Sequence, residues 1–369
     1  MRFHLLGLAH TKTSREFAAC AFTQKILKEA RMFSQIGEVI HYGAEGSDVP
    51  CEHVTVISDG EQRSVYGDRD WRKKVYAYDA RDLAYTIFND RAAQAIQKRA
   101  GPNDFLLITF GHAQRPIADE LRMPFTVESG VGYEGIFAPF HVFESYAWMH
   151  HLYGRLGMST GNWYDAVIPN SFDPADFQLA TAPGSYLLYI GRLIEAKGVH
   201  IAAQVADAAG LPLVVAGQGN PEALGVANNA KVRCVGVVGP ADRNELMGGA
   251  IALLAPTLYI EPFGGVAVEA QLCGTPVITT DWGAFPETVE HGMSGFRCRT
   301  MDDFLFSIGA CGKLDRASIR ARAVKLYSMD TAREMYREYF GKLDDIRRDG
   351  WYQRHPERTS LDWLRRTWA

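Results

Sequence analysis

Two glutamates with seven residues between them, Glu261 and Glu269, are the carboxylates whose surroundings best suit ligand binding. An apolar run at 252–255 ends shortly before Glu261, and residues 264–273 follow a helical pattern. We therefore expect Glu261 in a loop after a strand and Glu269 on the helix that follows. There Glu261 can accept hydrogen bonds from sugar hydroxyls, and Glu269 can reach a ribose. The alternative is a pair of solvated carboxylates near a helix start.

Glycines precede this predicted helix. Gly264 and Gly265 carry no side chain, so backbone N–H groups at the helix start can approach a ligand closely. A helix start of this kind favours an anionic ligand.

Two cations flank a predicted strand-to-helix turn in the segment Tyr189–Gly198. Arg192 and Lys197 beside a helix N-terminus can neutralise a diphosphate leaving group, on which negative charge grows as a glycosidic bond breaks. An Arg–Lys pair by itself is more often surface charge, but the strand and glycine on either side favour the binding interpretation.

A glycine turn follows the next predicted strand, with Gly217 and Gly219 in the sequence Ala-Gly-Gln-Gly-Asn. A lone Gly-x-Gly is a weak signal. The stretch 237–240, which contains Val238, comes after a further strand.

These segments, in this order, resemble glycosyltransferase family 4 over roughly residues 165–300. That family carries a Glu-x7-Glu motif ahead of a segment like 271–278, and its Gly-Arg-Leu…Lys-Gly segment holds the donor diphosphate. The resemblance implies a nucleotide diphosphate sugar as co-substrate and no separate cofactor. The donor-binding residues that it implies are Arg192, Lys197, Gly217, Gly219, Val238, Glu261, Phe263, Gly264, Gly265 and Glu269.

The same resemblance implies a catalytic group in the first half of the chain. His112 follows an apolar strand, at the carboxyl end where ligands of doubly wound sheets gather. A histidine at the corresponding strand end of the family contacts the donor sugar, so His112 joins Glu261, Arg192 and Lys197 as a catalytic candidate. A structural role for His112 is the equal alternative.

Three residues are candidates for the acceptor side. His10 and Thr11 follow the first predicted strand, where Thr13 and Glu16 fit a capping box and predict a helix start. The family often has a Gly-Gly loop there, which this chain lacks. Glu128 ends another predicted strand and could bind the acceptor or act as a base; capping by the next serine is the alternative.

Short apolar runs alternate with helical patterns along the whole chain, which predicts an α/β fold with parallel sheets. The resemblance makes this two Rossmann-like domains facing across a cleft, the GT-B architecture. We divide the chain into an acceptor-side domain at 1–169, a donor domain at 170–328, and a C-terminal helix and tail at 329–369 that packs back on the first domain. The polar stretch 59–79 is interpreted as a long functional loop or a surface excursion. The predicted strands span residues 3–8, 38–42, 53–57, 105–110, 125–128, 186–190, 213–216, 232–235, 252–255 and 276–279.

Composition is that of an ordinary folded protein. Of 369 residues, 47% are hydrophobic and 22% charged, so both domains can bury a core. No apolar run reaches membrane length, from which we expect a cytoplasmic protein without an integral membrane segment. The net charge of −4 gives no support to general nucleic-acid binding.

A metal site is not expected. Asp68-Arg69-Asp70 matches the DxD pattern of the other major glycosyltransferase architecture, but it lies in a polar stretch without a strand end beside it. We therefore discount it and predict metal-independent chemistry.

The sequence thus predicts a retaining glycosyltransferase that moves a sugar from a nucleotide diphosphate donor to a hydroxyl on a glycan, lipid, small molecule or modified nucleobase. A nucleic-acid acceptor is possible but not favoured by the acidic body of the chain. The alternatives are a nucleotide-sugar epimerase of the same architecture and a donor-binding regulatory protein.

Overall fold

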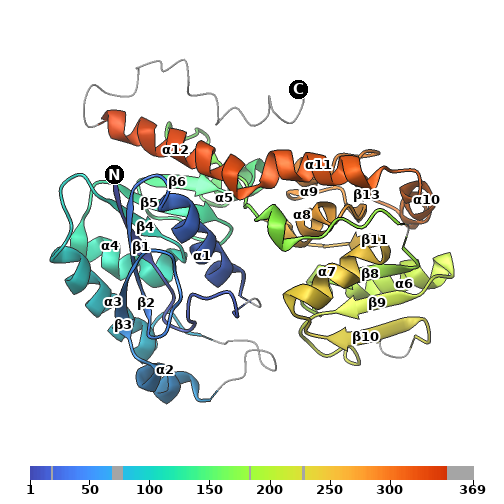
Figure 1. Cartoon of the computed structure of the whole chain (residues 1–369), viewed down its shortest axis with the longest axis horizontal. Coiled ribbons are helices and arrows are strands. Elements are labelled where there is room, and N and C mark those ends of the chain that lie inside the picture. Colours follow the sequence, from blue (N-terminus) through green and yellow to red (C-terminus); the bar gives the residue numbers. More distant parts are fainter. Residues whose placement is uncertain (18–19, 69–77, 183, 227–228, 347–369) are drawn as a thin grey trace. The chain divides into compact units, whose positions relative to one another are not determined.

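The computed structural model describes residues 1–17, 20–68, 78–182, 184–226 and 229–346 (Figure 1). Strands and helices alternate along these residues and form two parallel sheets with flanking helices. This arrangement confirms the α/β fold class that the apolar runs predict.

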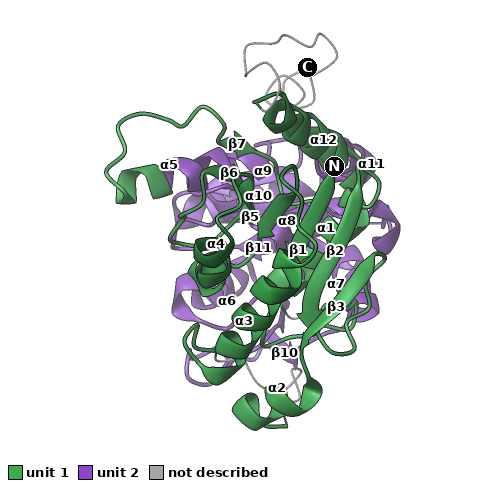
Figure 2. Ribbon diagram, turned by 90° about the vertical axis from the view of Figure 1, so that its left-hand side faces the viewer, with its two compact units in different colours: residues 1–144, 152–171, 329–369 green, residues 145–151, 172–328 purple. Residues whose placement is uncertain are grey.

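The chain divides into two compact units (Figure 2). The first contains residues 1–144, 152–171 and the chain from 329 onward, and the second contains residues 145–151 and 172–328. Helix α5 (Tyr146–Arg155) therefore begins in the second unit and ends in the first.

A seven-stranded parallel sheet organises the first unit, in the order β3-β2-β1-β4-β5-β6-β7. Its central strand β1 pairs with β2 on one side and β4 on the other, and Phe3 lies opposite both Val39 and Phe105. The sequence predicted the first five strands and missed the short β6 and β7. The bounds are β1 Arg2–Leu6, β2 Glu38–Ala44, β3 Glu52–Ile57, β4 Phe105–Ile108, β5 Thr126–Val131, β6 Phe140–Phe143 and β7 Ala166–Val167.

Helix α12 (Met329–Ile346) packs against α1 (Ala21–Phe33) in this unit. The ring of Phe340 lies 4.7 Å from that of Phe3 and 5.4 Å from that of Phe33. One face of α12 is apolar and packed inward, because Ala332, Tyr336, Tyr339 and Leu343 are all buried. The tail beyond residue 346 lies outside the described residues. The other helices of the unit are α2 Asp59–Tyr66, α3 Leu83–Gln97 and α4 Arg115–Leu121.

One local prediction for the first unit is wrong, and a second is wrong in part. Helix α1 starts at Ala21 after an N-cap without a side-chain bond, so Thr13 and Glu16 form no capping box. The Thr13 hydroxyl instead lies 3.1 Å from His41 Nε2. The stretch 59–79 is not all loop, because its first residues form α2, capped by Ser58. Its residues 69–77 lie outside the described residues.

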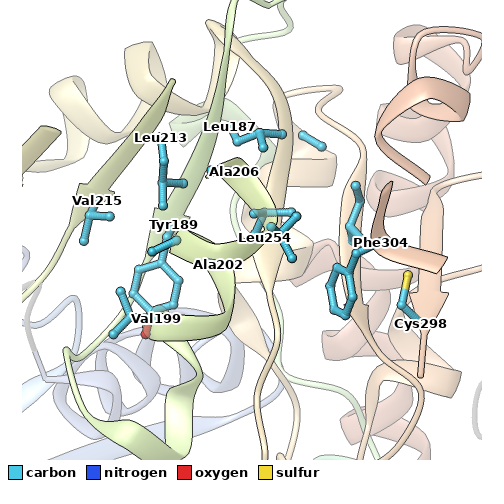
Figure 3. Packing of buried hydrophobic residues seen from close by; sticks show 14 of the residues in the cluster. Leu187, Tyr189, Val199, Ala202, Ala206, Leu213, Val215, Leu254, Cys298 and Phe304 are labelled. Atoms are coloured by element: carbon cyan, nitrogen blue, oxygen red, sulfur yellow. The ribbon is translucent and has the colours of Figure 1, made fainter. Parts of the chain in front are cut away.

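A six-stranded parallel sheet, in the order β10-β9-β8-β11-β12-β13, organises the second unit. Figure 3 shows side chains of α6 (Val199–Ala209), among them Val199 and Ala202, beside strand residues such as Tyr189 and Leu254. The sequence missed β13, and the other five strands lie where apolar runs predict them. The bounds are β8 Tyr186–Ile190, β9 Leu213–Ala216, β10 Val232–Gly236, β11 Ala250–Ala255, β12 Val277–Thr280 and β13 Gly295–Cys298.

Five further helices lie in the described part of the second unit. Among the described residues, no helix of either unit is both long enough and apolar enough to cross a membrane. The bounds are α7 Pro240–Gly248, α8 Gly265–Leu272, α9 Phe285–Thr288, α10 Met301–Cys311 and α11 Arg316–Tyr327.

Candidate active site

The turns after β8 and β9 pack directly on each other at the carboxyl edge of the second sheet. The amide of Leu193 donates to the carbonyl of Gln218 over 2.8 Å. A Cβ on Gly217 (φ +145°) would lie 1.8 Å from the carbonyl oxygen of Gly191, and one on Gly219 (φ +140°) would lie 2.6 Å from Leu193 Cβ. Packing of the two turns therefore requires both glycines, and their predicted role beside a nucleotide stays a prediction.

Lys197 and Glu261 meet at this edge. Lys197 Nζ lies 2.5 Å from Glu261 Oε2, and the Tyr259 hydroxyl donates to the same oxygen over 2.9 Å. The ammonium also lies 4.9 Å from the centre of the Tyr259 ring. Only 20% of the Lys197 side chain and 11% of the Glu261 side chain are exposed. Because both contacts use Oε2, Glu261 Oε1 is the oxygen with which this carboxylate can accept a bond from a ligand hydroxyl.

The neighbouring hydroxyls stay protonated. Burial and the Glu261 charge raise the pKa of both Tyr189 and Tyr259. The charge of Arg192 opposes both rises. The Arg192 side chain is exposed, while its carbonyl accepts a bond from the Tyr189 hydroxyl over 2.9 Å. Of the two predicted diphosphate ligands, Lys197 contacts the Glu261 carboxylate and Arg192 lies in the turn after β8.

The loop that carries Glu261 is held by the turn after β12. The Ala284 amide donates to the Glu261 carbonyl over 2.9 Å. Gly283 (φ +63°) passes so close that a Cβ there would lie 2.6 Å from the Glu261 nitrogen. The Glu261 backbone is therefore fixed before any ligand arrives.

Helix α8 begins directly after this loop. Gly264 is its N-cap residue, has φ +78° and supplies no side-chain cap, and Gly265 opens the first turn. Phe263 is only 2% exposed and its ring packs edge-on against Tyr327 at 5.8 Å. The side chain of Phe263 therefore belongs to the core, and a contact with the donor would have to use its backbone.

Glu269 lies on α8, as predicted, and forms an ion pair with Arg243 of α7. Val238, which is half-buried, lies just before α7. Sequence reasoning missed Arg243, because nothing in the pattern around it distinguishes it from a surface arginine. It also missed Tyr259, although that residue stands two positions before Glu261 in the same loop.

In the first unit, His112 lies in a 3-10 turn, Gly111–Gln114, that follows β4. The side chain of Gln114 fixes this turn: its Oε1 accepts from the amides of Thr109 and Phe110 over 2.8 and 3.0 Å, and its Nε2 donates to the Gly7 carbonyl over 2.7 Å. His112 itself is exposed at the carboxyl edge of the sheet. This position matches the sequence prediction, which did not anticipate Gln114.

The acceptor-side candidates are all buried. His10 Nδ1 lies 2.8 Å from the Tyr85 hydroxyl, and the Thr11 hydroxyl lies 2.6 Å from that of Thr23. Glu128, in β5, is fully buried. Contacts of these three side chains with an acceptor stay predictions, and each residue already has a partner inside the unit.

No group of three or more histidine, cysteine, aspartate or glutamate residues is arranged to hold a metal ion in the part of the chain that the structure describes. Of the DxD triplet, Asp68 is 88% exposed and ion-paired with Arg63, and the other two residues lie outside the described ranges. Metal independence stays a prediction.

Part of the chain is similar in sequence to known glycosyltransferases. Residues 184–309 match the family model "Glycosyl transferases group 1". A glycogen synthase from Mycobacterium tuberculosis is 34% identical over 178 residues, which cover 43% of this chain and 42% of that protein. A D-inositol 3-phosphate glycosyltransferase from Corynebacterium jeikeium is 43% identical over 76 residues, 20% of this chain and 17% of the relative. The chain therefore spans less than half the length of these curated relatives.

Solved structures match over nearly the whole chain. AviGT4, a glycosyltransferase involved in avilamycin A biosynthesis, superposes with a TM-score of 0.68 at 22% identity, covering 93% of this chain and 98% of that one. HepE from Anabaena, solved with UDP and glucose, gives 0.66 at 16% identity, covering 92% and 99%. At these identities the likeness establishes the fold. The chain thus has the GT-B fold, and its segment 184–309 is similar to the glycosyl transferases group 1 family.

Proposed function

We propose that this chain is a retaining glycosyltransferase that moves a sugar from a nucleoside diphosphate sugar to a hydroxyl-bearing acceptor. The observation that carries the proposal is the contact of Lys197 with Glu261 beside the exposed Arg192, within the segment that matches the family. HepE structures solved with UDP and with UDP-glucose support a nucleotide sugar as the donor and make uridine donors the first to test.

The charges suit a diphosphate leaving group. Lys197 and Glu261 neutralise each other, so Arg192 supplies the excess positive charge at this edge of the sheet. As the bond between the anomeric carbon and the phosphate oxygen breaks, negative charge grows on the diphosphate and its attraction to Arg192 and Lys197 increases. Glu261 Oε1 would accept a bond from a hydroxyl of the transferred sugar.

Same-face attack is the route that we favour for retention of configuration. The acceptor oxygen bonds to the anomeric carbon on the side that the diphosphate leaves, and the acceptor proton passes to a diphosphate oxygen. A double displacement would need a carboxylate nucleophile. Glu128 fits that role poorly, because it is buried and both of its oxygens accept hydrogen bonds. We assign His112 to the transferred sugar, as the family resemblance implies.

Calorimetric titration with UDP, GDP, ADP and TDP identifies the nucleotide, and release of that nucleotide from its sugar in the presence of candidate acceptors measures transfer. We expect Lys197→Ala to lower turnover on the order of 10²-fold, with a smaller effect on donor affinity. The matched control is Lys231→Ala, since Lys231 pairs with Asp207 on the surface of the same unit and should leave turnover unchanged.

Two results would overturn the proposal. One is a wild-type protein that binds none of the nucleotides. The other is conversion of the donor sugar to its epimer without any acceptor, which would identify an epimerase of the same fold.

A further inference from the structure

His112 packs against the segment 133–138, here called the 133–138 loop. Gly135 (φ +81°) lies so close that a Cβ on it would be 2.4 Å from His112 Nε2. The rings of His112 and Phe137 stack, with centroids 5.7 Å apart and planes inclined by 25°. The exposed imidazole therefore has one edge and one face supported by this loop.

The turn that carries His112 contacts the same loop through its first residue. Gly111 (φ +56°) approaches the Tyr133 ring, which a Cβ on Gly111 would meet at 2.7 Å. Both ends of the 133–138 loop thus contact the His112 turn. A shift of the loop would remove this support from the imidazole, although Gln114 still holds the backbone of the turn.

The Glu128 carboxylate holds the loop at both ends. Its Oε2 accepts from the amides of Phe137 and Ala138 over 2.7 and 2.9 Å, and its Oε1 accepts from the Tyr133 hydroxyl over 3.0 Å. Hydrogen bonds to an ionised acceptor are about twice as strong as neutral ones. A buried carboxylate with three donors from one loop defines the conformation of that loop.

Glu128 is in turn held from its other side. His141 of β6 places Nε2 3.4 Å from Glu128 Oε2 and Nδ1 2.7 Å from Asp165 Oδ1. Asp165 also accepts from Tyr153 and Asn162 over 2.5 and 3.2 Å. The carboxylate therefore connects the buried side chains of His141 and Asp165 to the loop behind His112.

We propose that Glu128 is a positioning residue for His112, acting through the 133–138 loop and not through contact with substrate. The inference rests on the proposed function only in taking His112 as catalytic. A misplacement of about 1 Å can lower turnover on the order of 10²-fold, so a loosened loop would be visible in kinetics. A general role in folding is the alternative that the experiment must separate.

The positioning itself is tested without turnover, by NMR of the His112 imidazole and hydrogen exchange of the Phe137 and Ala138 amides. We expect Glu128→Ala to shift the imidazole resonances and to speed exchange of both amides about tenfold or more, since it removes their acceptor. Glu128→Gln retains an acceptor oxygen and should stay near wild type. Glu134→Ala is the control, because Glu134 lies in the same loop but pairs with Arg155 at the surface. An unchanged imidazole in folded Glu128→Ala would overturn the inference.

A double-mutant cycle with His112→Ala then tests whether the effect on catalysis passes through the imidazole. Glu128→Ala should lower kcat about 10- to 100-fold with little change in donor KM, and should add nothing in the His112→Ala background. A general folding role predicts the same loss in both backgrounds, and that result would overturn the inference. If the wild type transfers no sugar at all, the proposed function fails, while the NMR comparison still decides the positioning.

If Glu128→Ala does not fold, Gly135→Ala replaces it, because the added Cβ is directed at His112 Nε2 and leaves Glu128 in place. The expected results are the same shift of the imidazole and the same dependence on His112. Wild-type kcat and imidazole resonances in Gly135→Ala would overturn the inference.

Discussion

Replacing His141 by asparagine should remove a pH-dependent contribution to the stability of the first unit. The His141 side chain is 6% exposed and lies between Asp165 and Glu128. Burial alone would lower its pKa, but the hydrogen bonds and charges of the two carboxylates raise the pKa to about 9. Against an unfolded pKa of 6.5, this rise corresponds to about 3 kcal/mol at ~1.4 kcal/mol per unit.

The sign follows from the direction of the shift. Because the folded pKa of His141 lies above the unfolded value, the folded state binds the proton more tightly. The contribution is fully present below the unfolded pKa of 6.5 and is lost as the pH rises through about 9. The difference in free energy of unfolding between wild type and His141→Asn should therefore be largest in mild acid and should shrink by about 3 kcal/mol in mild alkali.

Urea unfolding followed by circular dichroism, at several pH values across this window, measures that difference. If the two units unfold in separate urea transitions, the substitution should shift only the transition of the first unit. Part of the loss will not depend on pH, since the substituted asparagine leaves two buried carboxylates without their cation. A wild-type-minus-variant difference that stays constant across the window would refute the assignment of a charged, doubly paired His141.

Three further outcomes are expected. Burial raises the pKa of Glu29 to about 7 against the opposing charge of Lys25, so its ionisation destabilises the fold as the pH rises from 4.5 through 7. Glu29→Gln should then stabilise the protein by up to about 3 kcal/mol in mild alkali and by little near pH 4.5, and a gain in urea unfolding that is the same at every pH would contradict this. Gly217→Ala should destabilise by about 2 kcal/mol or more in thermal unfolding, because its Cβ meets the Gly191 carbonyl; an unchanged melting temperature would show that the turns can separate. Sugar transfer should persist in EDTA, and activity that is lost there and restored by a divalent cation would revive Asp68 and its neighbours as a metal site.

Strands of the second unit were the most predictable elements. The strands Tyr186–Ile190 and Leu213–Ala216 have the bounds that their apolar runs predict, because strands covered on both faces are apolar at every position. Strand β6 interrupts that pattern with His141, a polar residue satisfied by partners distant in sequence. Strand β7 spans only Ala166–Val167, and two residues are too few to show the hydrophobic pattern of a strand.

The sequence predicted which residues belong to the candidate site and which turns carry them. It did not predict which of these side chains contact each other. Motif order placed Lys197 and Glu261 in turns at one sheet edge, but the 2.5 Å contact between them depends on how those turns fold. Glu128 shows the opposite case. Its place at the end of an apolar run suggested a side chain that faces a ligand, whereas the donors that draw it inward come from residues 133–138, a stretch with no recognisable pattern.

Lys197 and His112, the candidate catalytic residues of the two units, differ in how firmly neighbouring residues hold their side chains. Lys197 is held by an aromatic face and by a carboxylate that a tyrosine hydroxyl also contacts, so it needs little reorganisation to meet a diphosphate. His112 stands exposed on a short turn, and Gln114 fixes the backbone of that turn without reaching the imidazole. Such a side chain keeps one orientation only if a neighbouring segment supports it. The orientation of the imidazole therefore depends on the residue that fixes that segment, and Glu128 is a buried carboxylate that accepts from three groups of that loop.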